Sequence, residues 1–98
     1  MDFRLKVFYT VAIRLNFTKA AAELYISQPA VSKHIQELEE TYKTKLFERN
    51  GSKIALTPAG HLLLQHTKSI FDIYREIEFD MSSFVTKRQG LLRLGAST

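Results

Sequence analysis

The 98 residues include 45% hydrophobic side chains, carry a formal net charge of +4 and contain no cysteine. This length fits one small domain, and the apolar content is enough for a core and excludes a disordered chain. The lack of cysteine excludes disulfides, thiol nucleophiles and cysteine-ligated zinc. No apolar run approaches the roughly 18 residues that cross a bilayer, and charges interrupt the N-terminal segment where a signal peptide would be apolar. We therefore expect a soluble, cytoplasmic protein with no membrane partner, and the basic excess suits a polyanion.

Two helices are predicted at the start of the chain. Residues 3–15 contain neither Gly nor Pro. Apolar residues recur there at three- and four-residue spacing, which is typical of an amphipathic helix: Leu5, Phe8, Ala12 and Leu15. Asn16 and Phe17 interrupt this pattern, and Thr18 is placed to cap a second, short helix that ends near Leu24.

A third helix is predicted to begin near Pro29. Proline is accepted in the first turn of a helix, because its missing N–H has no partner there. Ser27 is the expected N-cap, and Gln28 is the alternative if Pro29 is the first helical residue. The apolar stripe of this helix is Val31, Ile35, Leu38 and Tyr42, and its polar face is Gln28, Ser32, Lys33, Gln36 and Glu40.

A β-hairpin is predicted next. Residues 45–49 and 53–57 flank Asn50-Gly51, which is a strong signal for a hairpin turn. A two-stranded ribbon alone is marginally stable. We therefore expect its apolar residues to pack on the helices: Leu46, Phe47, Ile54 and Leu56.

A long helix should follow, with Thr57 as its N-cap and Pro58 in its first turn. No helix breaker lies between Gly60 and Gly90, so about 30 residues would span roughly 45 Å. That is too long to be buried against so small a domain. We expect pairing with the same helix of a second subunit, the alternative being ordinary core packing. The heptad seam is Leu63, Thr67, Ile70, Tyr74, Ile77, Met81 and Phe84. Residues 90–95 then predict a turn and the start of a short strand.

Residues 18–42 have the spacing of a helix-turn-helix. In that motif the second helix enters the major groove of DNA, and its N-terminal residues meet the base edges. Gln28, Ser32 and Lys33 lie on the free face of this helix. Gln can pair with adenine, Lys with guanine or a phosphate, and Ser with several acceptors. The alternative is a polar helix face that contacts only solvent.

The run from Phe17 to Glu39, FTKAAAELYISQPAVSKHIQELE, resembles the signature of LysR-type transcriptional regulators. Leu46-Phe47-Glu48-Arg49 and Leu56-Thr57-Pro58-Ala59-Gly60 resemble that family's wing and the start of its linker helix. The resemblance covers residues 1 to about 90, and SQPAVS is its most specific part. It implies a mainly α fold, with a winged helix-turn-helix of three helices and a two-stranded wing in residues 1–57. Residues 58–89 would be the dimerising linker helix, and residues 90–98 the start of an effector-binding domain.

The resemblance also implies roles for individual residues. At the start of the recognition helix, bases or nearby phosphates would be contacted by Ser27, Gln28, Pro29, Ser32 and Lys33. Thr18 would lie by a phosphate, and Arg49 and Lys53 of the wing would reach the DNA backbone or the minor groove. A homodimer on an interrupted inverted repeat of double-stranded DNA would be held together by Leu63, Ile70, Tyr74, Ile77, Met81 and Phe84. A tetramer is the alternative for a longer protein. These residues need no cofactor, and a small-molecule effector would bind the following domain.

The chain departs from the family pattern at two positions. The family usually has Gly where this chain has Lys43, and a non-Gly residue in the left-handed conformation costs on the order of 1 kcal/mol. We therefore expect the turn at Lys43 to be reshaped. The family often has Arg at the position of Ser52. Lys53 would replace it only with its side chain on the other face of the strand.

Other functions find less support. His61 and His66 are five residues apart, which does not align them on one helix face, and His34 is distant in sequence, so we expect no metal site. No phosphate-binding glycine loop, nucleophile elbow or convincing acid pair indicates an enzyme. The remaining alternative is a protein-interaction module, in which the long helix recruits a partner and the winged domain is a scaffold.

Overall fold

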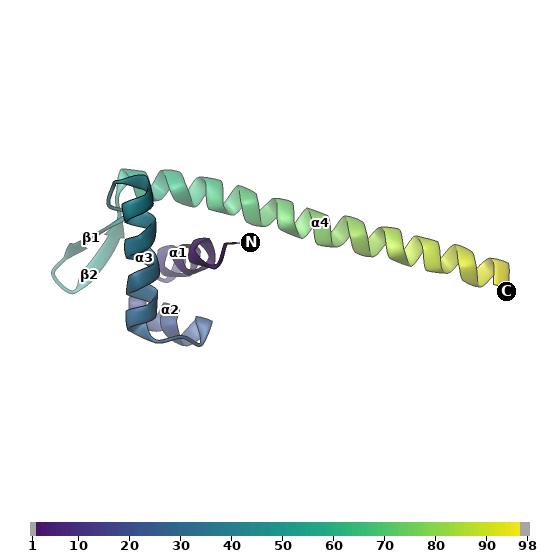
Figure 1. Ribbon diagram of the computed structural model, residues 1–98, viewed down its shortest axis with the longest axis horizontal. Helices are drawn as coiled ribbons and strands as arrows, with labels where there is room; N and C mark the ends of the chain where they lie inside the picture. The colour runs from purple at the N-terminus through teal and green to yellow at the C-terminus, as the bar shows by residue number, and fades with distance from the viewer. Residues whose placement is uncertain (1, 97–98) are drawn as a thin grey trace. The chain divides into compact units, whose positions relative to one another are not determined.

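The computed structural model describes residues 2–96, and the side chains of residues 2–88. Its elements are α1 (Phe3–Arg14), α2 (Phe17–Leu24), α3 (Gln28–Tyr42), β1 (Phe47–Asn50), β2 (Lys53–Leu56) and α4 (Pro58–Ala96). These are the three helices, two-stranded wing and long helix that the sequence predicts (Figure 1). The chain forms two compact units, which divide within α4 between Lys68 and Ser69. None of the described helices is both long enough and apolar enough to span a membrane.

The core of the first unit lies where α1, α2 and α3 pack against one another (Figure 1). Ala20 and Ala21 are small enough for α2 to approach its neighbours closely. Tyr42, expected on the buried stripe of α3, is 52% exposed, so that part of the prediction is wrong. Burial of each large apolar side chain contributes on the order of 1.5–3 kcal/mol. The other buried apolar residues are Val7, Phe8, Val11, Ala12, Val31, Ile35, Leu38, Leu46 and Phe47.

Polar side chains cap the start of each helix. Ser27 Oγ accepts a hydrogen bond from the Ala30 N–H at 3.2 Å, and Thr57 Oγ1 accepts one from the Gly60 N–H at 3.0 Å, which confirms both predicted caps. Asn16 caps α2, its Oδ1 accepting from the Lys19 N–H at 2.8 Å, so the prediction of Thr18 was wrong. Asn16 precedes Lys19 by three residues, so its side-chain oxygen can reach the Lys19 N–H.

Asp2 caps α1, because its Oδ1 accepts a hydrogen bond from the Arg4 N–H at 2.8 Å. The Arg4 guanidinium also donates to this carboxylate. These hydrogen bonds favour the charged form and lower the pKa of Asp2.

Three helices end at residues in the left-handed conformation although none of the three is glycine. Leu15, Tyr25 and Lys43 have φ of 49°, 58° and 54°. At the end of α3 the Lys43 N–H donates to the Glu39 carbonyl. The left-handed turn is thus kept with a lysine in it, and the expectation of a reshaped turn was wrong.

The hairpin differs from the prediction by one residue in its turn. Asn50 pairs with Lys53, so the two-residue loop is Gly51-Ser52, one residue later than the predicted Asn50-Gly51. Gly51 has φ of +66°, and glycine at the first loop position is typical of type II′ turns. The register also pairs Phe47 with Leu56, which places both on the face that packs against the core. Packing of the apolar hairpin residues on the helices is confirmed: Leu46 and Phe47 are buried, and Ile54 and Leu56 are half-buried.

Helix α4 continues through Gly90 and Gly95 to Ala96, so the predicted turn and strand over residues 90–95 are wrong. An isolated strand would leave its backbone N–H and C=O groups unpaired within the chain. A helix pairs these groups internally, at a cost of about 1 kcal/mol for each glycine. Residues 97 and 98, expected to belong to the start of an effector-binding domain, lie outside the described residues.

Candidate nucleic-acid interface

Helix α3 presents a polar face opposite its buried stripe. Gln28, Pro29 and Lys33 are exposed and Ser32 is half-buried. The stripe on the other side of the helix, Val31, Ile35 and Leu38, is at most 3% exposed. The predicted contact residues therefore share one accessible face at the start of a helix whose orientation the core determines.

The turn before α3 is held by backbone hydrogen bonds. The Tyr25 N–H donates to the carbonyls of Ala21 and Ala22, and the Ile26 N–H donates to Ala21 at 3.1 Å. Ile26 also packs against the core. This arrangement is a helix C-terminal motif stabilised by an apolar contact, and it holds the first turn of α3 in place. The N–H groups of that first turn carry a partial positive charge, which attracts phosphate.

Thr18 lies at the second position of α2 and is exposed. Because Asn16 caps this helix, the Thr18 hydroxyl is not required for capping. Thr18 is therefore placed near a second helix N-terminus where a phosphate would be stabilised.

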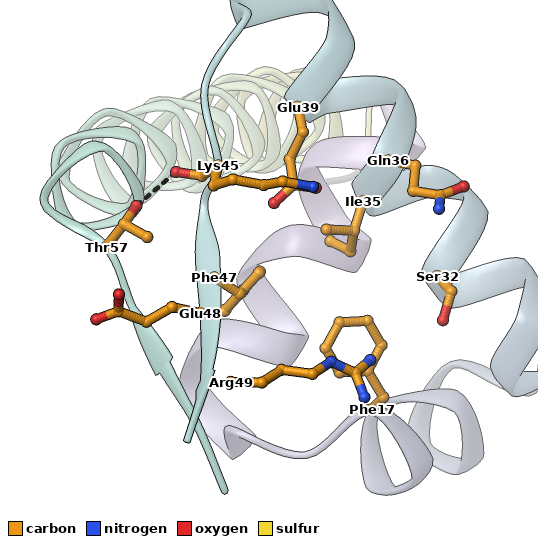
Figure 2. Close-up of a pocket in the computed structure, with 10 residues that line it drawn as sticks. All are labelled: Phe17, Ser32, Ile35, Gln36, Glu39, Lys45, Phe47, Glu48, Arg49 and Thr57. Atoms are coloured by element: carbon orange, nitrogen blue, oxygen red, sulfur yellow. Dashed lines mark hydrogen bonds and ion pairs between the residues drawn. The ribbon is translucent and has the colours of Figure 1, made fainter. Parts of the chain in front are cut away.

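A cleft of about 500 Å³ lies between α3 and the wing, and we call it the α3–wing cleft (Figure 2). Ser32 and Gln36 of α3 form one wall, and Lys45, Glu48 and Arg49 lie on the other. Phe17, Ile35 and Phe47 also line it. The cleft therefore combines polar, cationic and acidic side chains with an aromatic surface, and it lies beside the predicted recognition face.

The hairpin register separates the two predicted wing cations. Arg49 pairs with Ile54, and Lys53 with Asn50. Directly paired residues share a face of the sheet and successive residues alternate between faces, so Arg49 and Lys53 lie on opposite faces. Arg49 points into the α3–wing cleft, where its Cζ lies 5.4 Å from the centroid of the Phe17 ring (Figure 2). Lys53 is exposed beside the turn.

Two further residues of the cleft were not identified from the sequence. The side chain of Glu39 is only 13% exposed, and its Oε2 accepts a hydrogen bond from the Leu46 N–H at 2.9 Å. Its Oε1 lies 3.7 Å from Lys45 Nζ. No local pattern predicts these contacts, because they join the end of α3 to residues that lie beyond a turn and before β1.

The predicted dimerisation residues are not all equally accessible. Leu63 is half-buried and packs against the core, and Thr67 is fully buried, its Oγ1 donating to the Leu63 carbonyl at 2.7 Å. Ile70 is half-buried. The residues of the seam beyond it are 42–59% exposed: Tyr74, Ile77, Met81 and Phe84. The accessible part of the seam therefore begins near Ile70.

Residues 3–61 match the family of bacterial regulatory helix-turn-helix proteins called the lysR family. The chain belongs to this family. It is 37% identical over 95 residues to the RuBisCO operon transcriptional regulator of Allochromatium vinosum, and 38% identical over 93 residues to the HTH-type transcriptional regulator CysL of Bacillus subtilis. These matches cover 97% and 95% of this chain but 32% and 31% of the relatives. The chain thus spans about a third of the length of the curated relatives it matches.

Solved structures of LysR-family proteins have the same fold. A transcriptional regulator of the LysR family from Eggerthella lenta is 47% identical, with a TM-score of 0.66, and the match covers 69% of this chain and 97% of that one. The protein chain in the complex of BenM_DBD with catB site 1 DNA is 30% identical, with a TM-score of 0.82, covering 90% and 96%. The protein chain in the complex of CbnR_DBD with DNA is 32% identical, with a TM-score of 0.76, and the match covers 87% of this chain and 99% of that one. The predicted winged helix-turn-helix fold is confirmed.

The family is one of bacterial regulatory proteins, and the relatives are named as transcriptional regulators and not as enzymes. Within the residues that the structure describes, no group of three His, Asp or Glu side chains could hold a metal ion.

Proposed function

We propose that the chain is the DNA-binding part of a dimeric transcription regulator that recognises an interrupted inverted repeat. One observation carries the proposal: the accessible polar face of α3 lies on a fold shared with two domains solved in complex with DNA. With α3 in the major groove, Gln28, Ser32 and Lys33 would meet base edges, and Pro29 would pack beside them. Ser27, at the helix N-terminus, would lie close to a phosphate.

The phosphate contacts would come from elements around α3. Thr18 would bind a phosphate at the start of α2. Arg49 would bind the backbone from the α3–wing cleft. Lys53, on the other face of the hairpin, would reach a different part of the DNA, the backbone or the minor groove beside the turn. Contacts of this kind fix orientation and provide salt-dependent affinity, whereas base contacts provide specificity.

The dimer would form through α4, on the seam of Leu63, Ile70, Tyr74, Ile77, Met81 and Phe84. From Tyr74 on, the side chains of this row are about half exposed, which is costly in water, and they are covered when two such helices pair. In the longer protein, residues from 90 on would lead into a domain that binds a small-molecule effector, and a tetramer could form through that domain. The regulator would act in the cytoplasm.

Selection from a pool of random double-stranded DNA, followed by titration at several salt concentrations, tests this function. We expect enrichment of an inverted repeat, and an affinity that falls steeply with salt, by about 0.9 in log–log slope for each phosphate contact. Gln28→Ala should relax base preference at one position of each half-site. Lys53→Ala should weaken all sequences alike and reduce the salt slope by about 1.

Two results would contradict the proposal. Equal affinity for selected and unselected duplexes would exclude sequence-specific binding. If the chain showed no salt-dependent DNA affinity but bound another protein through residues 58–88, the protein-interaction function would replace it.

A further inference from the structure

A row of three aromatic rings runs from the core to the α3–wing cleft. The fully buried Phe8 contacts Phe47, with ring centroids 5.5 Å apart, and Phe47 meets Phe17 edge-on at 6.0 Å. Phe17 is the first residue of α2, next to the Asn16 cap, so its backbone is fixed as well. Its ring is therefore anchored to the core on one side and lines the cleft on the other (Figure 2).

The guanidinium of Arg49 is held at this ring. Its Cζ lies 5.4 Å from the ring centroid, within the range of a cation–π contact. Among the described residues Arg49 makes no ion pair. A contact with a ring face does not use the guanidinium's N–H groups in conventional hydrogen bonds. The five N–H donors therefore remain available for an oxygen ligand.

The occupant of the cleft follows from the proposed function, on which this inference rests. If α3 enters the major groove and the wing approaches the neighbouring groove, the sugar–phosphate backbone between the two grooves passes between α3 and the wing. Ser32 and Gln36 would then face this strand from α3, and Lys45 and Arg49 from the hairpin.

Two carboxylates, Glu39 and Glu48, also line the cleft, but neither faces Arg49 (Figure 2). Glu39 is engaged by the Leu46 N–H and lies 3.7 Å from Lys45 Nζ. The Glu48 side chain extends to the side of β1 opposite to Arg49 (Figure 2). Arg49 is thus a cation with unused donors on the path of a phosphodiester.

We propose that Phe17 is a positioning residue for DNA binding, which holds Arg49 in the α3–wing cleft ready to bind a phosphodiester of the DNA backbone. An exposed arginine ordinarily loses side-chain freedom when it binds, and this loss weakens affinity. A ring that holds the guanidinium beforehand reduces the loss. The planar fork can then donate two parallel hydrogen bonds to one phosphate.

A double-mutant cycle on the 98-residue chain tests this role, with the duplex selected above as probe. Phe17→Leu keeps an apolar side chain but removes the ring, and should weaken binding about two- to fivefold, the equivalent of an exposed cation–π contact. Arg49→Gln should weaken binding further and lower the salt slope by about 0.9. In the Arg49→Gln background, Phe17→Leu should have no further effect. Phe17→Tyr, which keeps a ring face, should bind as the wild type does.

The matched control is Phe3→Leu. Phe3 is 42% exposed and packs edge-on against His34. The effect of Phe3→Leu on DNA binding should be the same whether residue 49 is Arg or Gln. If Phe17→Leu also weakens binding equally in both backgrounds, Phe17 is only a structural residue and the proposal is overturned.

A measurement on the unmodified chain covers the case in which Phe17→Leu does not fold. Nuclear magnetic resonance should show the Arg49 side-chain protons shifted by the Phe17 ring, both free and in the DNA complex. Loss of that shift on DNA binding would overturn the proposal. Lack of any salt-dependent DNA binding by the wild type would instead overturn the proposed function, and this inference with it.

Discussion

The carboxylate of Glu39, near the end of α3, accepts a hydrogen bond from the backbone N–H of Leu46, with Oε2 and N 2.9 Å apart. Leu46 is 1% exposed and immediately precedes β1, so this N–H lies where water cannot easily replace the carboxylate. The contact joins α3 directly to the base of the wing. This hydrogen bond is therefore one of the contacts that hold the base of the wing against α3.

Replacing Glu39 should destabilise the winged domain. Glu39→Ala leaves the Leu46 N–H without its acceptor, which costs about 1–3 kcal/mol of unfolding free energy in urea. Glu39→Gln keeps an amide oxygen and should lose less. Glu40→Ala is the control, because Glu40 is exposed on the same turn and its removal should change stability by no more than about 0.5 kcal/mol. Equal losses for Glu39→Ala and Glu40→Ala would contradict this role.

Gly60 allows α4 to start against the base of the wing. A Cβ on Gly60 would lie 2.2 Å from the Leu46 carbonyl oxygen and 2.8 Å from Leu56 Cδ2. Because the nearer atom is backbone, Gly60→Ala should lower the unfolding free energy by about 1–3 kcal/mol, despite alanine's better helix propensity.

The control for Gly60 is Gly51→Ala in the hairpin turn. A Cβ on Gly51 meets nothing within 4 Å, but its φ is +66°, so only backbone strain of about 1 kcal/mol should appear. Urea unfolding of Gly60→Ala and Gly51→Ala compares the two variants by their unfolding midpoints. The prediction for Gly60 fails if its variant is no less stable than the wild type.

The two candidate caps of α2 should separate stability from DNA binding. Asn16→Ala removes the acceptor of the Lys19 N–H and should cost about 1 kcal/mol of unfolding free energy. Thr18→Ala should leave stability within about 0.5 kcal/mol of the wild type, yet weaken binding to DNA through loss of a phosphate contact. Thermal unfolding and DNA titration of both variants check this, and a larger stability loss for Thr18→Ala would contradict the observed cap.

These caps show how far the sequence determines the fold. The caps at Ser27 and Thr57 are predictable because each places a side-chain oxygen three residues before the N–H that it accepts from. At α2 two polar residues two positions apart, Asn16 and Thr18, both suit a cap by local rules, and the backbone of the preceding turn decides between them. The hairpin register is ambiguous for the same reason, since Asn50-Gly51 and Gly51-Ser52 both suit a turn. Both registers keep Phe47 and Leu56 on one face of the hairpin, so the alternation of apolar residues does not select between them. In the folded chain Phe47 pairs directly with Leu56, which gives the second loop.

Helical periodicity predicts the candidate site only where the site lies on one helix. Gln28, Ser32 and Lys33 follow helical spacing, so their shared face could be read from the sequence. The contact of Phe17 with Arg49 joins α2 to β1 and has no periodic signal. It depends on the tertiary arrangement of the core and the wing.

Lys43→Gly should stabilise the domain. Lys43 has φ of 54°, a conformation that costs a residue with a side chain about 1 kcal/mol more than glycine. We expect the unfolding free energy to rise by about 0.5–1 kcal/mol. Lys43→Ala removes the same charge but keeps the strain, and should not show this gain. A gain common to both variants would assign the effect to charge and not to the backbone.

The seam of α4 gives the sharpest test of the dimer. Ile77 is 50% exposed. In a symmetric dimer each seam residue occurs twice, so Ile77→Glu would place two charges in the interface. We expect the dimer dissociation constant, measured by sedimentation, to rise tenfold or more, which corresponds to about 1.4 kcal/mol. Binding to the inverted repeat should weaken in parallel, because one dimer would no longer bind both half-sites.

Phe79→Glu is the matched control for that experiment. Phe79 is 71% exposed, and two residues beyond Ile77 it lies about 200° around the helix, away from the seam. Its replacement adds the same charge to the same helix but should leave dimerisation and DNA affinity unchanged. If instead Phe79→Glu dissociates the dimer and Ile77→Glu does not, the helices pair through the opposite face. If neither does, the subunits are held together elsewhere.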